Sequence, residues 1–174
     1  TSGKSTNVDF ITRILEESDN KVASVSSIRF KIKDKEWKNN LKMTMPGRFI
    51  IQKFLRQAVN EKCKYAVLEV TSEGIKQFRH KFINFDTAVF TNLSPEHIES
   101  HGGFENYRNE KLKLFKANQN IHVINIDDQN TKYFFEIPAK KIITFGLENG
   151  DINTKNTQIH LQMLGDFNKY NALA

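Results

Sequence analysis

The sequence predicts an α/β fold of the P-loop NTPase type, in which helices flank a mostly parallel sheet. Almost continuous apolar segments alternate with helical stretches, which is typical of parallel strands buried on both faces. These segments cover residues 65–70, 87–92, 121–126 and 141–145. Residues 1–6 read TSGKST, which matches the second half of the phosphate-binding pattern GxxxxGK[ST]. The first strand of the fold and the leading glycine of that pattern are therefore expected upstream of Thr1.

The remaining elements follow from periodicity and from the residues that begin and end them. Further helices are expected at residues 7–16, 47–62, 73–79 and 106–118, and further strands at residues 22–25 and 28–32. The second of these helices follows Pro46 and carries apolar side chains at helical spacing. Residues 152–154 and 158–162 are polar and rich in Asn and Thr, which predicts a small antiparallel addition near the C-terminus. A last helix is expected to begin at Asn168.

Length and composition limit the class of protein. The 174 residues fit one domain with its own core, and the formal net charge of +6 suits anionic ligands such as nucleotides or nucleic acid. Because the lysines are scattered, a solvated surface is expected and not a nucleic-acid patch. The single cysteine, Cys63, excludes an internal disulfide and a cysteine-cluster metal site, and it fits a reducing cytosol. No apolar run approaches the roughly 18 residues that span a bilayer, so a soluble, cytoplasmic protein without a membrane partner is expected.

The phosphate loop carries the first candidate site. Gly3 lets backbone amides approach a phosphate closely, and Lys4 brings a positive charge to the β and γ oxygens of a nucleotide. Ser5 offers a hydroxyl to Mg²⁺, and Thr6 completes the motif. The helix that follows directs its positive end toward the same anion.

Three polar clusters further along the chain are candidates for metal or acid–base chemistry. Glu69 ends an apolar segment, where a carboxylate either holds Mg²⁺ or caps the next helix. Glu96 and His97 suggest metal binding or acid–base catalysis. The alternative is that both are ordinary side chains of an exposed loop. A zinc enzyme is disfavoured because the spacing matches neither HExxH nor a Cys/His pattern. Lys111 is expected beside the core face of an amphipathic helix. It is either an ordinary surface lysine or a residue of the functional site.

Taken in order, these motifs resemble the central ATP-binding domain of the Mur ligases. The resemblance rests on GKST at 3–6, MTMP at 43–46, EVTSEG at 69–74, FTNLSPEH at 90–97, HG at 101–102, NIDD at 125–128 and LGDFN at 164–168. It covers essentially residues 1–174, and the branch it resembles most joins an amino acid to UDP-MurNAc-L-Ala-D-Glu. A domain that binds the UDP group and a domain that delivers the amino acid are then expected outside this sequence, and these 174 residues alone are expected to lack ligase activity.

The resemblance implies a peptidoglycan-precursor ligase that uses ATP and two Mg²⁺ ions and works through an acyl phosphate. Its partners are a UDP-MurNAc peptide and an amino acid, and a monomer is expected. In this family Lys4 corresponds to the lysine that binds the ATP phosphates, and Ser5 to the ligand of one Mg²⁺. Glu69 corresponds to the glutamate directed toward both ions, and His97 to the histidine that binds the second. Lys111 corresponds to a lysine whose carbamate holds that second ion.

The resemblance also implies residues for the two larger ligands. Asn168 and Asn171 correspond to asparagines beside the adenine, and Gly3, Lys4, Ser5 and Thr6 complete the nucleotide set. Thr44, Ser72 and Arg79 correspond to positions that contact the UDP-sugar substrate. The chain departs from the family pattern at Met45, Glu96, Glu99 and Glu110, where Thr, Asp, Asp and Ala are usual.

Three alternatives stay open at this point. The chain is either a Mur ligase or another ligase of the superfamily, such as folylpolyglutamate synthase or cyanophycin synthetase. A P-loop NTPase that acts as a switch or as a nucleic-acid motor would use Glu69 in place of a Walker B aspartate. A relative without catalytic activity would bind nucleotide only.

Overall fold

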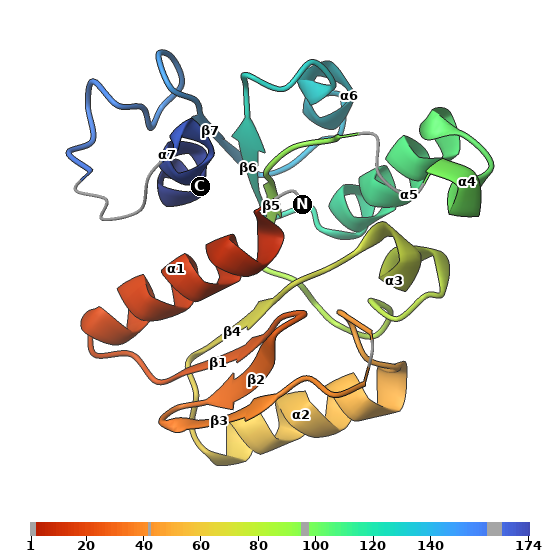
Figure 1. The fold of residues 1–174 in the computed structure, drawn as a ribbon, viewed down its shortest axis with the longest axis vertical. Coiled ribbons are helices and arrows are strands. Elements are labelled where there is room, and N and C mark those ends of the chain that lie inside the picture. The colour runs from red at the N-terminus through yellow and green to blue at the C-terminus, as the bar shows by residue number, and fades with distance from the viewer. Residues whose placement is uncertain (1–2, 42, 95–97, 160–164) are drawn as a thin grey trace. The chain divides into compact units, whose positions relative to one another are not determined.

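Helices and strands alternate along the chain in the computed structural model (Figure 1), which describes residues 3–41, 43–94, 98–159 and 165–174. The chain forms two compact units. The first unit is Lys4–Lys81, and the second unit comprises Thr1–Gly3 and Phe82–Ala174. The length of the chain predicted a single core, but the described strands form two separate sheets, and each unit packs around its own sheet.

The first unit contains a mixed sheet with the strand order β3-β2-β1-β4. Its elements are α1 (Lys4–Glu17), β1 (Val22–Val25), β2 (Arg29–Ile32), β3 (Lys35–Lys38), α2 (Arg48–Asn60), β4 (Tyr65–Leu68) and α3 (Ser72–Lys76). Strand β1 pairs in parallel with β4 and antiparallel with β2. Figure 1 shows α1 and α2 on opposite faces of this sheet. The four residues of β1 are all buried, as expected for a strand that is covered on both faces.

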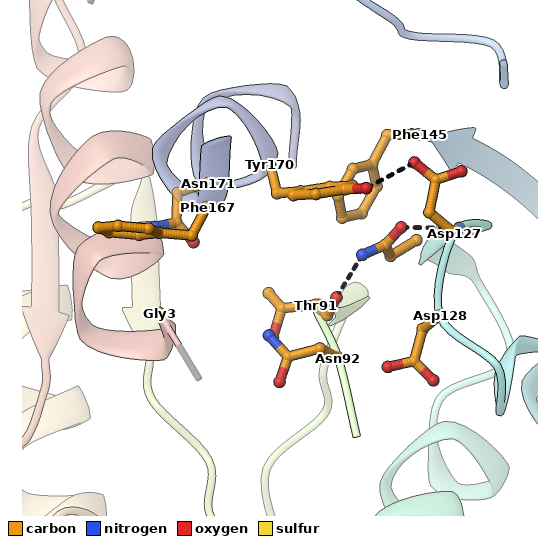
Figure 2. A pocket seen from close by; sticks show the side chains of 10 residues that line it. Gly3, Thr91, Asn92, Asp127, Asp128, Phe145, Phe167, Tyr170 and Asn171 are labelled. Atoms are coloured by element: carbon orange, nitrogen blue, oxygen red, sulfur yellow. Dashed lines mark hydrogen bonds between the residues drawn. The ribbon is translucent and has the colours of Figure 1, made fainter. Parts of the chain in front are cut away.

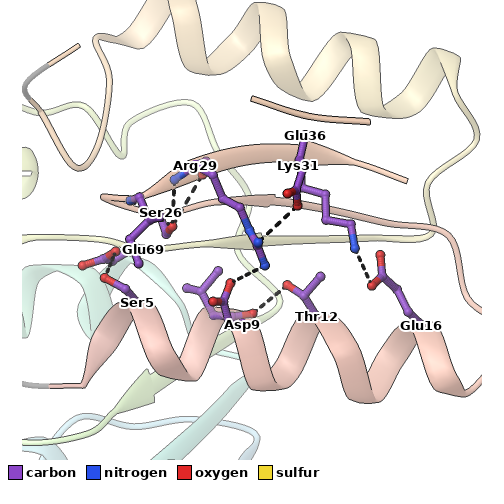
Figure 3. Close-up of polar contacts among 11 residues, drawn as sticks. Ser5, Asp9, Thr12, Glu16, Ser26, Arg29, Lys31, Glu36 and Glu69 are labelled. Carbon is purple, nitrogen blue, oxygen red and sulfur yellow. Dashed lines mark hydrogen bonds and ion pairs between the residues drawn. The ribbon is translucent and has the colours of Figure 1, made fainter. Parts of the chain in front are cut away.

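Side-chain alternation along β1 explains how the two helices pack. Ala23 and Val25 lie in one core cluster with Phe54 and Ala58 of α2, four residues apart on one face of that helix. The opposite face is held to α1 by charged side chains (Figure 3). Arg29 Nη2 lies 3.0 Å from an oxygen of Asp9, and Lys31 forms a second ion pair with α1.

The second unit contains a parallel sheet with the strand order β5-β6-β7. Its elements are β5 (Thr87–Phe90), α4 (Ile98–His101), α5 (Phe104–Ala117), β6 (Ile121–Asn125), α6 (Thr131–Phe135), β7 (Lys141–Phe145) and α7 (Asp166–Leu173). An aromatic cluster packs against one face of the sheet. In it the ring centroids of Phe90 and Phe134 lie 3.7 Å apart in a stacked arrangement, and the ring of Phe115 meets both edge-on. On the other face, Val123 and Phe145 pack with Leu173 of α7. Both faces of the predicted parallel strands are therefore covered.

Most predicted elements are confirmed, and α1 begins earlier than expected, at Lys4. Strand β3 was not predicted, because its sequence KEWK is highly charged and all four of its residues are exposed at the sheet edge. The antiparallel addition near the C-terminus is wrong for the described residues. Antiparallel pairing instead joins β1, β2 and β3. Among the described residues after Gly146, Ile152 forms an isolated parallel bridge with Phe145, and no strand is present. Residues 160–162 of that prediction lie outside the described residues.

Side-chain hydrogen bonds explain why the polar segment after Gly146 forms a loop. Asn153 Nδ2 donates to the carbonyl of Gly150, and Asn156 Nδ2 donates to the carbonyl of Asp151. Asn and Asp side chains compete in this way with the hydrogen bonds of a sheet. Within the described ranges, no helix is both long enough and apolar enough to cross a bilayer.

Asp151 is expected to stabilise the second unit near neutral pH and to lose this effect in acid. Its carboxylate accepts from the hydroxyl and the backbone N–H of Thr144 at 2.7 and 2.8 Å, and these bonds lower its pKa below the ordinary value of 3.8. A carboxyl whose pKa is lower in the folded state stabilises the fold above its unfolded pKa, and this contribution is lost as pH falls through the folded value. We expect Asp151→Asn to be less stable than wild type in urea unfolding at pH 6, and the difference to shrink below pH 3.8. A difference that stays constant into strong acid would contradict this.

Candidate functional site

Ser5 and Glu69, which are far apart in the sequence, meet in the first unit (Figure 3). Glu69 follows β4 and is 6% exposed. Its Oε2 accepts from the hydroxyl of Ser5 at 2.8 Å and from the backbone N–H of Ser27 at 2.8 Å. The start of α1, the end of β4 and the turn between β1 and β2 therefore converge on one buried carboxylate.

The alternative role of Glu69 as a helix cap is wrong. The side chain that caps α3 is Thr71, whose hydroxyl accepts from the backbone N–H of Gly74 at 3.1 Å. The carboxylate of Glu69 is directed instead to the first turn of α1, one residue after Lys4. A serine hydroxyl beside a carboxylate offers the hard oxygen ligands that Mg²⁺ prefers, so this pair fits a magnesium ion next to the phosphate loop.

Removing the carboxylate at position 69 is expected to destabilise the first unit. Glu69→Ala removes the carboxylate that accepts from the backbone N–H of Ser27 and from the hydroxyl of Ser5. Because hydrogen bonds to a charged group stabilise a fold by about 1.5–3 kcal/mol, the free energy of unfolding should fall by that order. Glu69→Gln is the matched control because its amide oxygen still accepts a hydrogen bond. Urea unfolding of the two variants checks this, and equal stability of Glu69→Ala and wild type would show that the contact contributes nothing.

The three predicted substrate residues also lie in the first unit, around α3. Arg79 Nη1 donates to the carbonyl of Met45 at 2.6 Å, which ties the segment containing Thr44 to the residues after α3. Ser72 is buried at the first residue of α3, and Thr44 is half-buried. Met45, which stands where the family pattern has Thr, is fully buried and packs against Gly74. The departure at position 45 therefore adds a core contact.

Lys111 lies in the second unit, on α5 and beside the loop that follows β5. Its Nζ is 3.5 Å from the carbonyl of Asn92 and 5.0 Å from the ring centroid of Tyr107. Glu110, the neighbour that departs from the family pattern, pairs with Lys113 at 2.6 Å. The carboxylate of Glu110 thus has a partner other than Lys111. His97 and Glu96 lie outside the described residues.

A hollow of about 260 Å³ opens in the second unit (Figure 2). It is lined by Gly3, Thr91, Asn92, Asn125, Asp127, Asp128, Phe145, Phe167, Tyr170 and Asn171. Gly3 has a φ of +70°, and a Cβ at this position would overlap the side-chain oxygen of Asn171. Asn168 is buried next to the hollow, and its Oδ1 accepts from Asn171 Nδ2 at 3.4 Å. Two residues predicted to bind nucleotide, Gly3 and Asn171, therefore line one hollow.

Sequence reasoning gave no role to several residues that line this hollow. Phe167 is 65% exposed on α7, and Tyr170 is directed into the hollow from the same helix (Figure 2). Asp127 and Asp128 follow β6. The aspartates could have been found from the sequence, because polar residues that end a parallel strand lie at the ligand-binding edge of a sheet. The aromatic residues gave no comparable signal.

Comparison with known protein families shows to which family this chain belongs. A sequence model of the family described as "Mur ligase middle domain" matches residues 1–174. The chain belongs to the Mur ligase family. Similar proteins include the UDP-N-acetylmuramoyl-L-alanyl-D-glutamate–2,6-diaminopimelate ligase 2 of Clostridium acetobutylicum, 31% identical over the whole chain and 40% of that protein. The UDP-N-acetylmuramoyl-L-alanyl-D-glutamate–2,6-diaminopimelate ligase of Caldanaerobacter subterraneus is 34% identical, with the same coverage.

Solved structures of Mur ligases share the fold of this chain. A UDP-N-acetylmuramoyl-L-alanyl-D-glutamate–2,6-diaminopimelate ligase superposes with a TM-score of 0.86 at 24% identity, over 99% of this chain and 40% of that one. MurF from Acinetobacter baumannii superposes with a TM-score of 0.72 at 18% identity, over 98% and 39%. This Mur ligase chain spans about two-fifths of the length of the relatives it matches. Among the alternatives drawn from the sequence, these relatives favour the Mur ligases.

Proposed function

We propose that this chain is the ATP-binding part of a ligase that adds an amino acid to UDP-MurNAc-L-Ala-D-Glu. The observation that carries the proposal is the contact between Ser5 and Glu69, directly after Gly3 and Lys4. This contact brings together the two oxygen ligands that phosphate-loop enzymes use for Mg²⁺. The relatives' names, which specify this dipeptide acceptor and 2,6-diaminopimelate, support the choice of substrates.

In the proposed reaction, the γ-phosphoryl group of ATP passes to a carboxylate of the acceptor and gives an acyl phosphate. The amine of the amino acid then attacks the acyl carbon, and inorganic phosphate leaves. The protein contributes mainly positioning and charge neutralisation. Lys4 would neutralise the β and γ oxygens, while Ser5 and Glu69 would hold one Mg²⁺. His97 and a carbamate on Lys111 would hold the second, and the bound Mg²⁺ ions supply further positive charge at the phosphates.

The other ligand-binding residues are part of the same proposal. Asn168 and Asn171 would lie beside the adenine, with Asn171 in the wall of the 260 Å³ hollow. Thr44, Ser72 and Arg79 would contact the UDP-sugar substrate. The UDP-MurNAc dipeptide and the amino acid are both water-soluble, so we further propose that the enzyme acts in the cytoplasm without a membrane partner. We also propose that it is a monomer without a nucleic-acid partner.

The proposed function is tested by measuring the release of ADP from ATP by the whole protein. ADP release should require both the UDP-MurNAc dipeptide and an amino acid, and 2,6-diaminopimelate is the first to compare with lysine. A folate acceptor and an assay without acceptor serve as controls. Turnover with folate alone would favour folylpolyglutamate synthase, and nucleotide binding without any release of ADP would favour a relative without catalytic activity.

A further inference from the structure

Asp127 joins two segments that approach the end of β6. One of its oxygens, Oδ2, accepts from the backbone N–H of Leu147 at 2.8 Å and from the phenol of Tyr170 at 3.0 Å. Leu147 follows β7, and Tyr170 belongs to α7. Figure 2 shows the bond between Tyr170 and Asp127 at the rim of the 260 Å³ hollow. A single carboxylate oxygen therefore links the ends of β6 and β7 to α7.

The surroundings hold this carboxylate in place. A Cβ added to Gly146 would lie 2.9 and 3.0 Å from the two carboxylate oxygens of Asp127 and 2.8 Å from a backbone carbonyl, so the position has no room for a side chain. The backbone N–H of Asp127 donates to Asn125 Oδ1 at 3.0 Å, and Asn125 Nδ2 donates to the carbonyl of Thr91 at 2.7 Å. Asp127 is thus anchored to the ends of β5 and β6.

We propose that Asp127 is a positioning residue for the nucleotide base. By holding Tyr170, it fixes the face of α7 on which Phe167 and Asn171 line the hollow. The inference rests on the proposed function, because it takes the nucleotide of that reaction as the ligand of the hollow. It adds a role for Asp127 that works through Tyr170 and needs no contact between Asp127 and the nucleotide.

The hydrogen bonds of the neighbouring carboxylate favour positioning over metal binding. Two aspartates after a buried strand are the pattern of a magnesium site. Asp128, however, accepts from the backbone N–H groups of Leu93 and Asn130 at 2.7 and 2.8 Å. Both aspartates therefore accept hydrogen bonds from the protein itself. Asp127 accepts from Tyr170 of α7, and Asp128 accepts from the backbone of Leu93, next to Asn92.

The test is a double-mutant cycle in the whole protein between Asp127→Ala and Tyr170→Phe. The loss of one hydrogen bond in Tyr170→Phe should raise KM for ATP roughly three- to tenfold and leave kcat and the Mg²⁺ concentration for half-maximal activity unchanged. Asp127→Ala should raise KM at least as much. The double variant should be no worse than Asp127→Ala, because the bond is already lost. Additive effects, or a changed Mg²⁺ requirement with KM unchanged, would overturn the proposal.

Asp151→Ala is the matched control. Asp151 also accepts from a backbone N–H and a hydroxyl, both of Thr144, in the same unit, but it does not line the hollow. Its loss should lower stability and leave KM for ATP unchanged. If Asp151→Ala raises KM as much as Tyr170→Phe, the effect is general destabilisation and the proposal fails.

Hydrogen exchange without nucleotide separates this inference from the proposed function. Tyr170→Phe should speed the exchange of backbone amides in α7 and leave those of α5 unchanged, whatever reaction the protein catalyses. Faster exchange in α7 in a protein that does not turn over ATP would support the role of Asp127 in holding α7 and refute the proposed function. Unchanged exchange in α7 would refute the role of Asp127 even in an active ligase. Tyr170→Phe changes only one hydroxyl, so this measurement remains decisive if Asp127→Ala does not fold.

Discussion

Replacing Lys4 by alanine is expected to lower the turnover number of the whole ligase by roughly a hundredfold to a thousandfold. Lys4 is the first residue of α1 and directly precedes Ser5, whose hydroxyl donates to Glu69. Its charge is expected to be most needed when negative charge develops on the transferring phosphoryl group. Lys4 is half-buried, and α1 is held by the buried side chains of Val8 and Thr12. The substitution should therefore leave the fold intact.

This result is checked by steady-state kinetics together with urea unfolding of the same variant. Lys53→Ala is the control, because Lys53 is an exposed lysine of α2 in the same unit. It should keep the turnover number of the wild type. If Lys4→Ala ligates at a near-normal rate, the phosphate loop assigned to residues 3–6 has another purpose.

Replacing Lys111 by alanine is expected to lower ligase activity roughly tenfold to a hundredfold, and added short carboxylic acids should restore part of it. In the proposed reaction the Lys111 carbamate supplies an oxygen ligand to the second Mg²⁺, and a small free carboxylate can occupy the space left by the side chain. The amine lies beside the carbonyl of Asn92 and over the ring of Tyr107. These contacts hold the amine beside the first residues of the loop that follows β5.

The matched control for this rescue lies two residues further along the same helix. Lys113→Ala removes an exposed lysine and its ion pair with Glu110 without touching the proposed carbamate. Activity of Lys113→Ala should be close to wild type and insensitive to acetate or formate. Full activity of Lys111→Ala without any added acid, or equal rescue of both variants, would show that position 111 carries no carbamate.

The sequence was sufficient to predict the parallel strands of the fold. Strands β5, β6 and β7 are confirmed because buried parallel strands are almost continuously apolar, a property of the residues themselves. Strand β3 was missed because it is an exposed edge strand, and its pairing depends on the partner β2 more than on its own composition. Residues 152–154 and 158–159 were wrongly predicted to be in strands, because the hydrogen bonds of Asp and Asn side chains to the backbone hold the described part of this segment as a loop.

The sequence predicted one contact of the candidate site, while the roles of its residues in binding metal and nucleotide stay predictions. The order of the motifs pointed to Ser5 and Glu69, and the structure places the two side chains in contact. The bond between Asp127 and Tyr170 could not be predicted, since it joins residues 43 positions apart and depends on tertiary packing. The ion pair between Glu110 and Lys113, in contrast, follows from the i,i+3 spacing of the two residues on one helix.

The binding of two divalent cations at the predicted ligands is tested most directly by anomalous scattering. Crystals of the whole protein with Mn²⁺ and a non-hydrolysable ATP analogue should show one peak at about 2.2 Å from oxygens of Ser5 and Glu69. A second peak should lie at coordination distance from His97 and from a carbamate on Lys111. Peaks that avoid all four side chains while the nucleotide is bound would contradict the proposed chemistry.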